Sequence, residues 1–101
     1  MSQERESISM RDVKLTEVFV TKYALSEGPF KVSAELSFGG AMASYRIGNS
    51  YTQTAHGKDF WLTEAEALAD CERRRAAKIK SIDKQKKKLE GMTFTIAEAS
   101  A

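Results

Sequence analysis

The fold is decided by residues 30–47, FKVSAELSFGGAMASYRI, which form two alternating segments joined by a glycine pair. From Phe30 to Phe38 every second side chain is apolar, which predicts a strand with one buried face. Gly39-Gly40 can take the positive φ angles of a two-residue hairpin turn. A slip of one residue would bury polar side chains, so the register is well specified. The expected pairs are Phe38–Ala41, Leu36–Ala43, Ala34–Tyr45 and Val32–Ile47.

A second turn is expected at Gly48-Asn49, before a strand over residues 50–55. Two registers are open. A two-residue loop pairs Tyr45 with Thr52, whereas a three-residue loop pairs Ile47 with Tyr51 and Ala43 with Ala55, which matches the side chains better. Residues 56–59 then form another turn, and residues 60–62 return apolar bulk to the core.

An earlier strand is predicted to begin near Val13 and to end before the turn residues Ser26–Pro29. One face of this strand carries more apolar residues, and the opposite face carries Val18 and Val20. We therefore expect both faces of the strand to be partly buried. The richer side holds Val13, Leu15, Phe19, Tyr23 and Leu25.

A long helix is predicted from Thr63 to Glu90, opened by a capping box of Thr63 and Glu66 and ended by Gly91. Residues 73–88 contain nine Lys or Arg and one acid, a net charge of +8. The rest of the chain, with the other seven basic and 13 acidic residues, carries −6. Part of this asymmetry matches the helix dipole, which favours acids at the start and bases at the end.

The predicted helix is amphipathic, and at roughly 1.5 Å per residue it is about 40 Å long. We expect it to pack across the apolar face of the sheet, with a C-terminal half that overhangs, breaks or packs on another copy. Two surfaces stand out. The candidate contact residues for nucleic acid or another anion are Arg73, Lys80, Lys84, Lys87 and Lys88. The apolar face holds Leu68, Cys71, Ile79, Ile82 and Leu89, interrupted by Arg75 and Lys86, and the candidate partner-helix seam within it is Ile79, Ile82 and Leu89.

Nothing in the sequence favours catalysis. His56 and Asp59 are close in sequence but lack an obvious nucleophile, and a polar turn is the better interpretation. Cys71, the single cysteine, falls on the apolar helix face as an inert thiol. The glycines lack the spacing of a phosphate loop, and metal ligands do not cluster. We therefore expect no enzyme, no catalytic residue, no metal, no cofactor and no small-molecule substrate.

Three segments carry a resemblance: residues 18–25 (VFVTKYAL), residues 56–67 (HGKDFWLTEAEA) and residues 88–94 (KLEGMTF). With them, the chain resembles a group of small uncharacterised proteins encoded by bacteriophages and prophages, over roughly residues 18–94. The resemblance implies a bacterial or phage origin and brings no established activity.

The prediction is one α+β domain over residues 13–96, with a flexible tail at 1–12 and a frayed end at 97–101. Its sheet has three or four antiparallel strands and is curled, and the long helix (63–90) leads to a short C-terminal strand, with Met92, Phe94 and Ile96 alternating. A chain of 101 residues without a signal-like or membrane-spanning run is expected in the cytoplasm of the bacterial host cell, with no membrane partner. The hypothesis is a non-enzymatic binding module that contacts nucleic acid or an acidic protein. The alternative is an interaction factor that acts on a host component or homodimerises through the helix.

Overall fold

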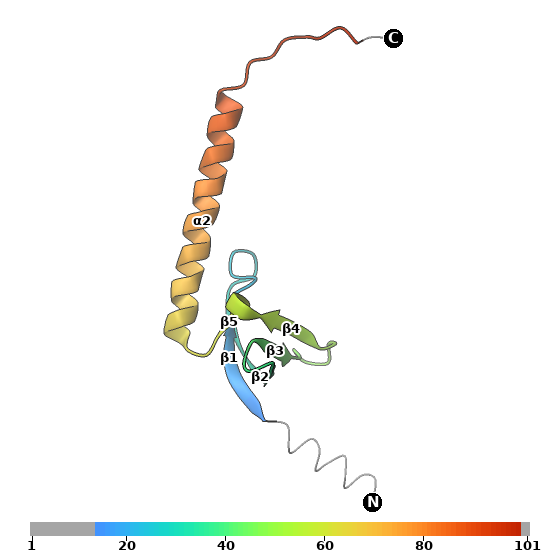
Figure 1. Ribbon diagram of the computed structural model, residues 1–101, viewed down its shortest axis with the longest axis vertical. Helices are drawn as coiled ribbons and strands as arrows, with labels where there is room; N and C mark the ends of the chain where they lie inside the picture. The colour runs from blue at the N-terminus through green and yellow to red at the C-terminus, as the bar shows by residue number, and fades with distance from the viewer. Residues whose placement is uncertain (1–13, 100–101) are drawn as a thin grey trace, which may run out of the picture.

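The protein is an α+β structure in which one long helix stands beside a small curled sheet (Figure 1). The computed structural model describes residues 14–99, so the expected tail at 1–12 and the last two residues lie outside the described part. The elements are β1 (Leu15–Val20), β2 (Phe30–Ser37), β3 (Met42–Tyr45), β4 (Gln53–His56), the 3-10 turn η1 (Gly57–Asp59), β5 (Phe60–Trp61) and α2 (Glu64–Glu90).

The five strands form one antiparallel sheet in the order β4-β3-β2-β1-β5. The predicted hairpin register is confirmed, because Leu36 pairs with Ala43. In the next hairpin Ala43 pairs with Ala55, which is the register that the three-residue loop required. The prediction of three or four strands is wrong. Phe60 and Trp61 form a fifth strand on the free side of β1, where they pair with Val20 and Phe19.

The core lies inside the curl of the sheet. Phe30 packs edge-on against Tyr45, with 5.9 Å between ring centroids. The sheet therefore covers its own apolar face. The buried core residues are Val18, Val20, Ala34, Ala43, Tyr45, Ala55 and Phe60.

The first strand is shorter than predicted and buries its other face. Val18 and Val20 are fully buried, whereas Leu15 is exposed. The chain leaves the sheet after Thr21, whose amide donates to the Asp59 carbonyl oxygen at 2.9 Å, and residues 22–27 form a turn. This turn, and not the strand, holds Tyr23 and Leu25.

The predicted packing of α2 across the sheet is wrong. Its buried residues are Ala67 and Asp70, and the helix contacts the sheet along β5 and β1. From Arg75 to Glu90 every residue is exposed, and α2 projects past the sheet (Figure 1). The Cα radius of gyration is 21.9 Å, against about 13 Å for a compact chain of this length. The reason is the self-covering core, which leaves α2 no apolar sheet face to bury.

The predicted short C-terminal strand is also wrong. Residues 92–99 have no regular secondary structure, and Met92, Phe94 and Ile96 are exposed. The helix ends at Glu90 as expected, but Gly91 has a φ of −86° and therefore does not turn the chain back in a left-handed cap. Since α2 carries these residues away from the sheet, they have no strand to pair with.

Candidate binding surface

Asp70 anchors α2 to the sheet. It lies nearly two turns into the helix and is only 6 % exposed. Its carboxylate accepts from the Thr21 hydroxyl at 2.7 Å and from Arg74 Nε at 2.7 Å. A buried carboxylate is costly unless it is paired and hydrogen-bonded, and both conditions are met here. Thr21 in turn accepts from Trp61 Nε1 at 3.2 Å, so the end of β1, β5 and α2 meet at one polar junction.

Arg74 extends this junction to the turn before β5. It donates to the Lys58 carbonyl oxygen at 3.0 Å and to the Asp59 carboxylate at 3.1 Å. Burial alone would raise the pKa of Asp70, but the hydrogen bonds from Arg74 and Thr21 outweigh it and hold that pKa below its ordinary value. The hydrogen bond to Asp70 raises the pKa of Arg74, so both groups are charged at neutral pH. The junction sets the direction in which α2 leaves the sheet.

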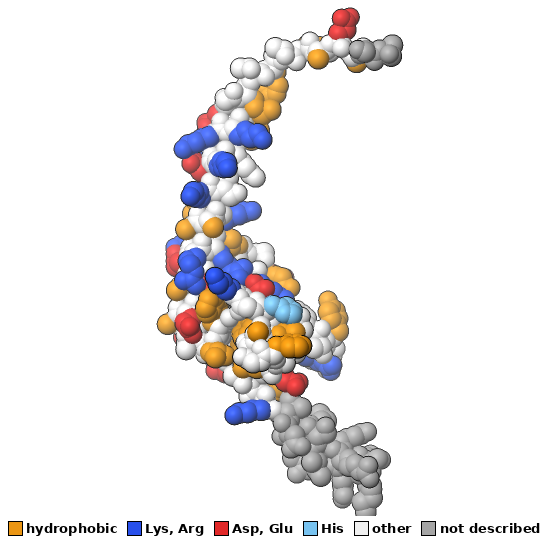
Figure 2. Space-filling view, in the orientation of Figure 1, with side chains coloured by type: hydrophobic (Ala, Val, Ile, Leu, Met, Phe, Trp, Pro, Cys, Tyr) orange, Lys and Arg blue, Asp and Glu red, His pale blue; other side chains and the backbone are white. Residues whose placement is uncertain are grey.

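The basic stripe of α2 comprises the five predicted contact residues Arg73, Lys80, Lys84, Lys87 and Lys88. Two of them are engaged within the chain. Arg73 pairs with Asp70 at 3.4 Å and lies over the Trp61 ring, 5.5 Å from its centroid, and Lys87 pairs with Asp83 at 3.2 Å. Lys80, Lys84 and Lys88 are exposed and form no ion pair with residues 14–99. Figure 2 shows Lys and Arg side chains along the projecting helix.

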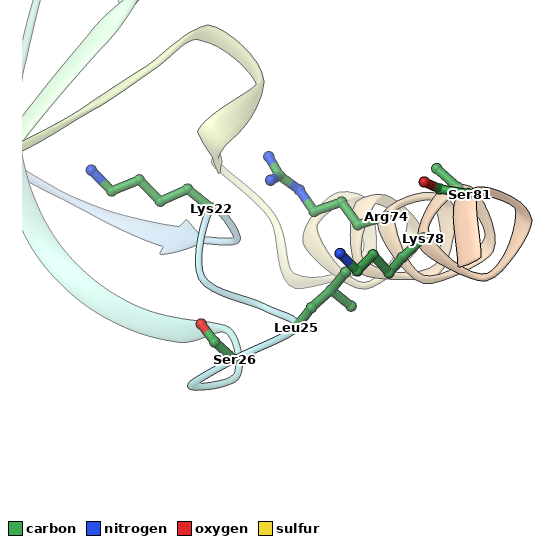
Figure 3. Close-up of a pocket in the computed structure, with 7 residues that line it drawn as sticks. Lys22, Leu25, Ser26, Arg74, Lys78 and Ser81 are labelled. Carbon is green, nitrogen blue, oxygen red and sulfur yellow. The ribbon is translucent and has the colours of Figure 1, made fainter. Parts of the chain in front are cut away.

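A cleft of about 590 Å³ lies between the 22–27 turn and the middle of α2 (Figure 3). Leu25 points toward the helix from the turn, and Lys78 reaches back from the helix. The amine of Lys22 points away from α2 and donates to the Thr54 carbonyl oxygen. Leu25 and Ala77 give the cleft its apolar lining, and Lys78 adds positive charge to the helical wall, whereas the charge of Arg74 is balanced by Asp70 and Asp59. The lining residues are Lys22, Leu25, Ser26, Arg74, Ala77, Lys78 and Ser81.

The predicted seam residues lie together on another side of the projecting helix. Ile79, Ile82 and Leu89 are 60 %, 51 % and 66 % exposed. Leu68 belongs to the same side and is 52 % exposed. At about 100° per residue, these four residues are centred roughly opposite the basic stripe. The projecting half of α2 thus presents a cationic side and an apolar side.

The groups considered for catalysis are not brought together. Asp59 is the ion-pair partner of Arg74. His56 is exposed, and the described residues 14–99 show no hydrogen bond between His56 and Asp59. Cys71 is half-buried and free. Within the described part of the chain, no three His, Cys, Asp or Glu residues are placed to share a metal ion.

The role of Asp70 is the main feature that sequence reasoning missed. Its spacing from Arg74 predicts an ordinary surface pair at i and i+4, but nothing local indicates that Thr21, 49 positions earlier, completes the site. One signal was available. Asp70 interrupts the apolar pattern formed by Ala67, Leu68 and Cys71, at the point where the helix meets the sheet.

Comparison with known proteins yields no match to a family model, a curated protein or a solved structure. None of the helices described in residues 14–99 has the length and apolar character needed to cross a bilayer.

Proposed function

We propose that the protein is a small non-enzymatic module that binds nucleic acid through the basic stripe of α2. The observation that carries the proposal is the row Lys80, Lys84 and Lys88, exposed and without acidic partners among residues 14–99 on a helix that stands clear of its sheet. Successive members are four residues apart, about 6 Å along the axis. Such a row suits an extended polyanion better than one compact anion, because a small ligand would reach only one or two of the amines.

Presentation of the stripe supports the same function. The polar junction at Asp70 fixes α2 to the sheet at the base of the projecting half. A helix held at one end and free along its length can lie against a nucleic-acid backbone without first breaking an internal contact. Lys78 continues the positive charge toward the cleft. Lys and Arg contacts to phosphate are independent of sequence and are weakened by salt.

Fluorescence anisotropy with labelled 20-nucleotide duplex DNA, single-stranded DNA and RNA tests the proposal across a salt series. The test variant is Lys80→Gln/Lys84→Gln/Lys88→Gln, since Gln keeps helix propensity while removing charge. We expect affinity to fall at least about tenfold and the slope of log K against log salt to shrink by up to about 3 for the duplex.

The matched control is Lys14→Gln/Lys31→Gln/Lys58→Gln, which removes the same charge from exposed positions outside α2. It should bind nearly as well as the unaltered protein. Equal losses of affinity in both triple variants would show a general effect of net charge and would contradict binding through the basic stripe. Absence of salt-sensitive binding to all three probes would contradict nucleic-acid binding itself. The phage or prophage origin implied by the resemblance stays a prediction, as does placement in the bacterial cytoplasm.

A further inference from the structure

We infer that the outer stripe of α2, formed by Leu68, Ile79, Ile82 and Leu89, binds the same stripe of a second copy in an antiparallel helix pair. Each of these residues is more than half exposed in the single chain. Their intervals of 11, 3 and 7 residues fit the three- and four-residue steps of a helix–helix seam, with Arg75 and Lys86 at two of the positions between them. The inference does not rest on nucleic-acid binding, because the basic stripe lies on another side of the helix.

Geometry leaves the outer stripe accessible. Asp70 and Arg74 define the side of α2 that faces its own sheet. At about 100° per residue, the outer stripe is centred roughly 120° away from that side. A second helix can therefore lie along α2 without displacing the sheet or the polar junction.

The charges along α2 favour a second copy as the partner and favour the antiparallel direction. On or beside the outer stripe, the first three turns of α2 carry Glu64 and Glu72, whereas the helix further along carries Arg75 and Lys86. A parallel pair would place Arg75 beside Arg75 and Lys86 beside Lys86, with like charges in contact. An antiparallel pair places the acidic start of each helix against the basic end of the other, and a second copy provides this complement by symmetry.

The same arrangement accounts for the two basic residues that interrupt the stripe. With Ile79 of both copies at the two-fold axis, Leu68 lies beside Leu89 of the second copy. Arg75 then lies opposite Asp83, and Lys86 lies opposite Glu72. Within one chain Arg75 pairs with Glu72, an exposed contact that contributes little and is easily exchanged.

The C-terminal segment adds an independent observation. A groove of about 270 Å³ lies between the start of α2 and strands β1 and β2, lined by Phe19, Pro29, Phe30, Lys31, Glu64, Ala67 and Leu68. In the antiparallel pair, residues beyond Gly91 of the second copy pass Glu64 and Leu68 at the mouth of this groove. That segment exposes Phe94 and Ile96 almost fully, at 84 % and 103 %. The pair thus covers apolar residues that a single chain leaves in water.

Sedimentation equilibrium of the full chain measures the association. We expect a dimer whose dissociation constant rises at least about tenfold in Ile79→Asp, because this change places two acids at the axis. Gln85→Asp, an exposed change on the same helix outside the outer stripe, should leave the dimer intact. Circular dichroism confirms that both variants fold. A monomer at all concentrations, or a dimer indifferent to Ile79→Asp, would overturn the inference.

Cross-linking determines the direction of the pair. In the antiparallel pair two Cys71 residues are about 24 Å apart along the axis, beyond the roughly 7 Å that a disulfide allows between Cα atoms. Oxidation should therefore cross-link Cys71→Ala/Ile79→Cys but not the unaltered chain. Glu72→Lys should weaken the dimer, and adding Lys86→Glu should restore it. A disulfide through Cys71, or no rescue by the second charge change, would overturn the antiparallel arrangement.

Discussion

At the scale of single residues, Asp70 has the largest structural role of any charged group in residues 14–99. It is the buried acid of the junction, and it accepts from Thr21 at the end of β1 and from Arg74 within α2, while Thr21 in turn accepts from Trp61 of β5. A polar junction of this kind specifies one orientation, because its hydrogen bonds are satisfied in one arrangement of the elements. An apolar contact of the same size would tolerate sliding.

Replacing Asp70 by Asn should lower the free energy of unfolding by about 2 kcal/mol, since Arg74 loses its charged partner and the Asn amide cannot accept both hydrogen bonds equally well. Asp83→Asn, which removes only an exposed i,i+4 pair with Lys87, should change it by less than about 0.5 kcal/mol. Urea denaturation of both variants provides the comparison. Equal effects would show that the junction does not hold the helix.

The pH dependence follows from the lowered pKa of Asp70. Because the folded pKa lies below the unfolded value of about 3.9, the stabilisation is complete well above that value and is lost as pH falls through the folded pKa. Unfolding free energy should therefore decrease as pH falls from about 5 toward 3, and Asp70→Asn should remove part of this slope. Denaturation series at several pH values measure it, and an unchanged slope in the variant would contradict the assignment.

At the scale of elements, the β2–β3 hairpin combines a well-specified register with a strained turn. The register is set by side-chain alternation, but Phe38 lies at the turn with a φ of +54° and is 78 % exposed. A bulky residue in the left-handed region costs roughly 1 kcal/mol, and here little burial offsets it. The predicted use of Phe38 as a core residue opposite Ala41 is wrong for this reason.

Phe38→Gly should raise the free energy of unfolding by up to about 1 kcal/mol, because glycine adopts positive φ without strain. The gain is reduced by the greater entropy that glycine brings to the unfolded chain. Thermal and urea unfolding measure the change, with Phe38→Ala as the control that removes the ring but keeps the strain. A stabilisation as large in Phe38→Ala would attribute the effect to the exposed ring instead of the backbone.

At the scale of the whole molecule, the core that stabilises the sheet and the surfaces proposed for binding lie in different parts. The sheet has its own core, and α2 contributes to it only through its first three turns. A chain that ends at Lys78 should therefore keep its fold, with a thermal midpoint within about 5 °C of the full chain. It should lose both dimerisation and nucleic-acid binding.

A chain that ends at Ala69 is the control, because it also removes Asp70 and Arg74 from the junction. It should be clearly less stable than the chain that ends at Lys78. Circular dichroism measures the thermal unfolding of both truncated chains. Loss of folded signal in the longer truncation would show that the projecting half supports the sheet, although none of its residues from Arg75 to Glu90 is buried.

Local patterns predicted the two hairpins and the helix, but not the length of β1, the fifth strand or the lack of regular structure in residues 92–99. The alternation of residues 30–38, the pairing of Ala43 with Ala55, the Thr63 cap and the helix end at Glu90 all follow from side chains near one another in sequence. The Thr63 hydroxyl accepts from the Glu66 amide, which is one of the two bonds of the predicted capping box, whereas the Glu66 carboxylate accepts from the Thr63 hydroxyl and not from its amide. The fifth strand was missed because two residues are too few for a period to show, and their pairing with β1 is long-range.

The sequence by itself determined the strands of the two hairpins, the bounds of a single long helix and the charge asymmetry along that helix, because each depends on periodicity or on neighbours within a few residues. Only the tertiary structure decided which surfaces remain free. The sheet curls until it buries its own apolar face, so α2 docks through Ala67, Asp70 and Arg74 and leaves its apolar and basic stripes in solvent. That outcome depends on contacts between residues as distant as Thr21 and Asp70, which no local pattern encodes.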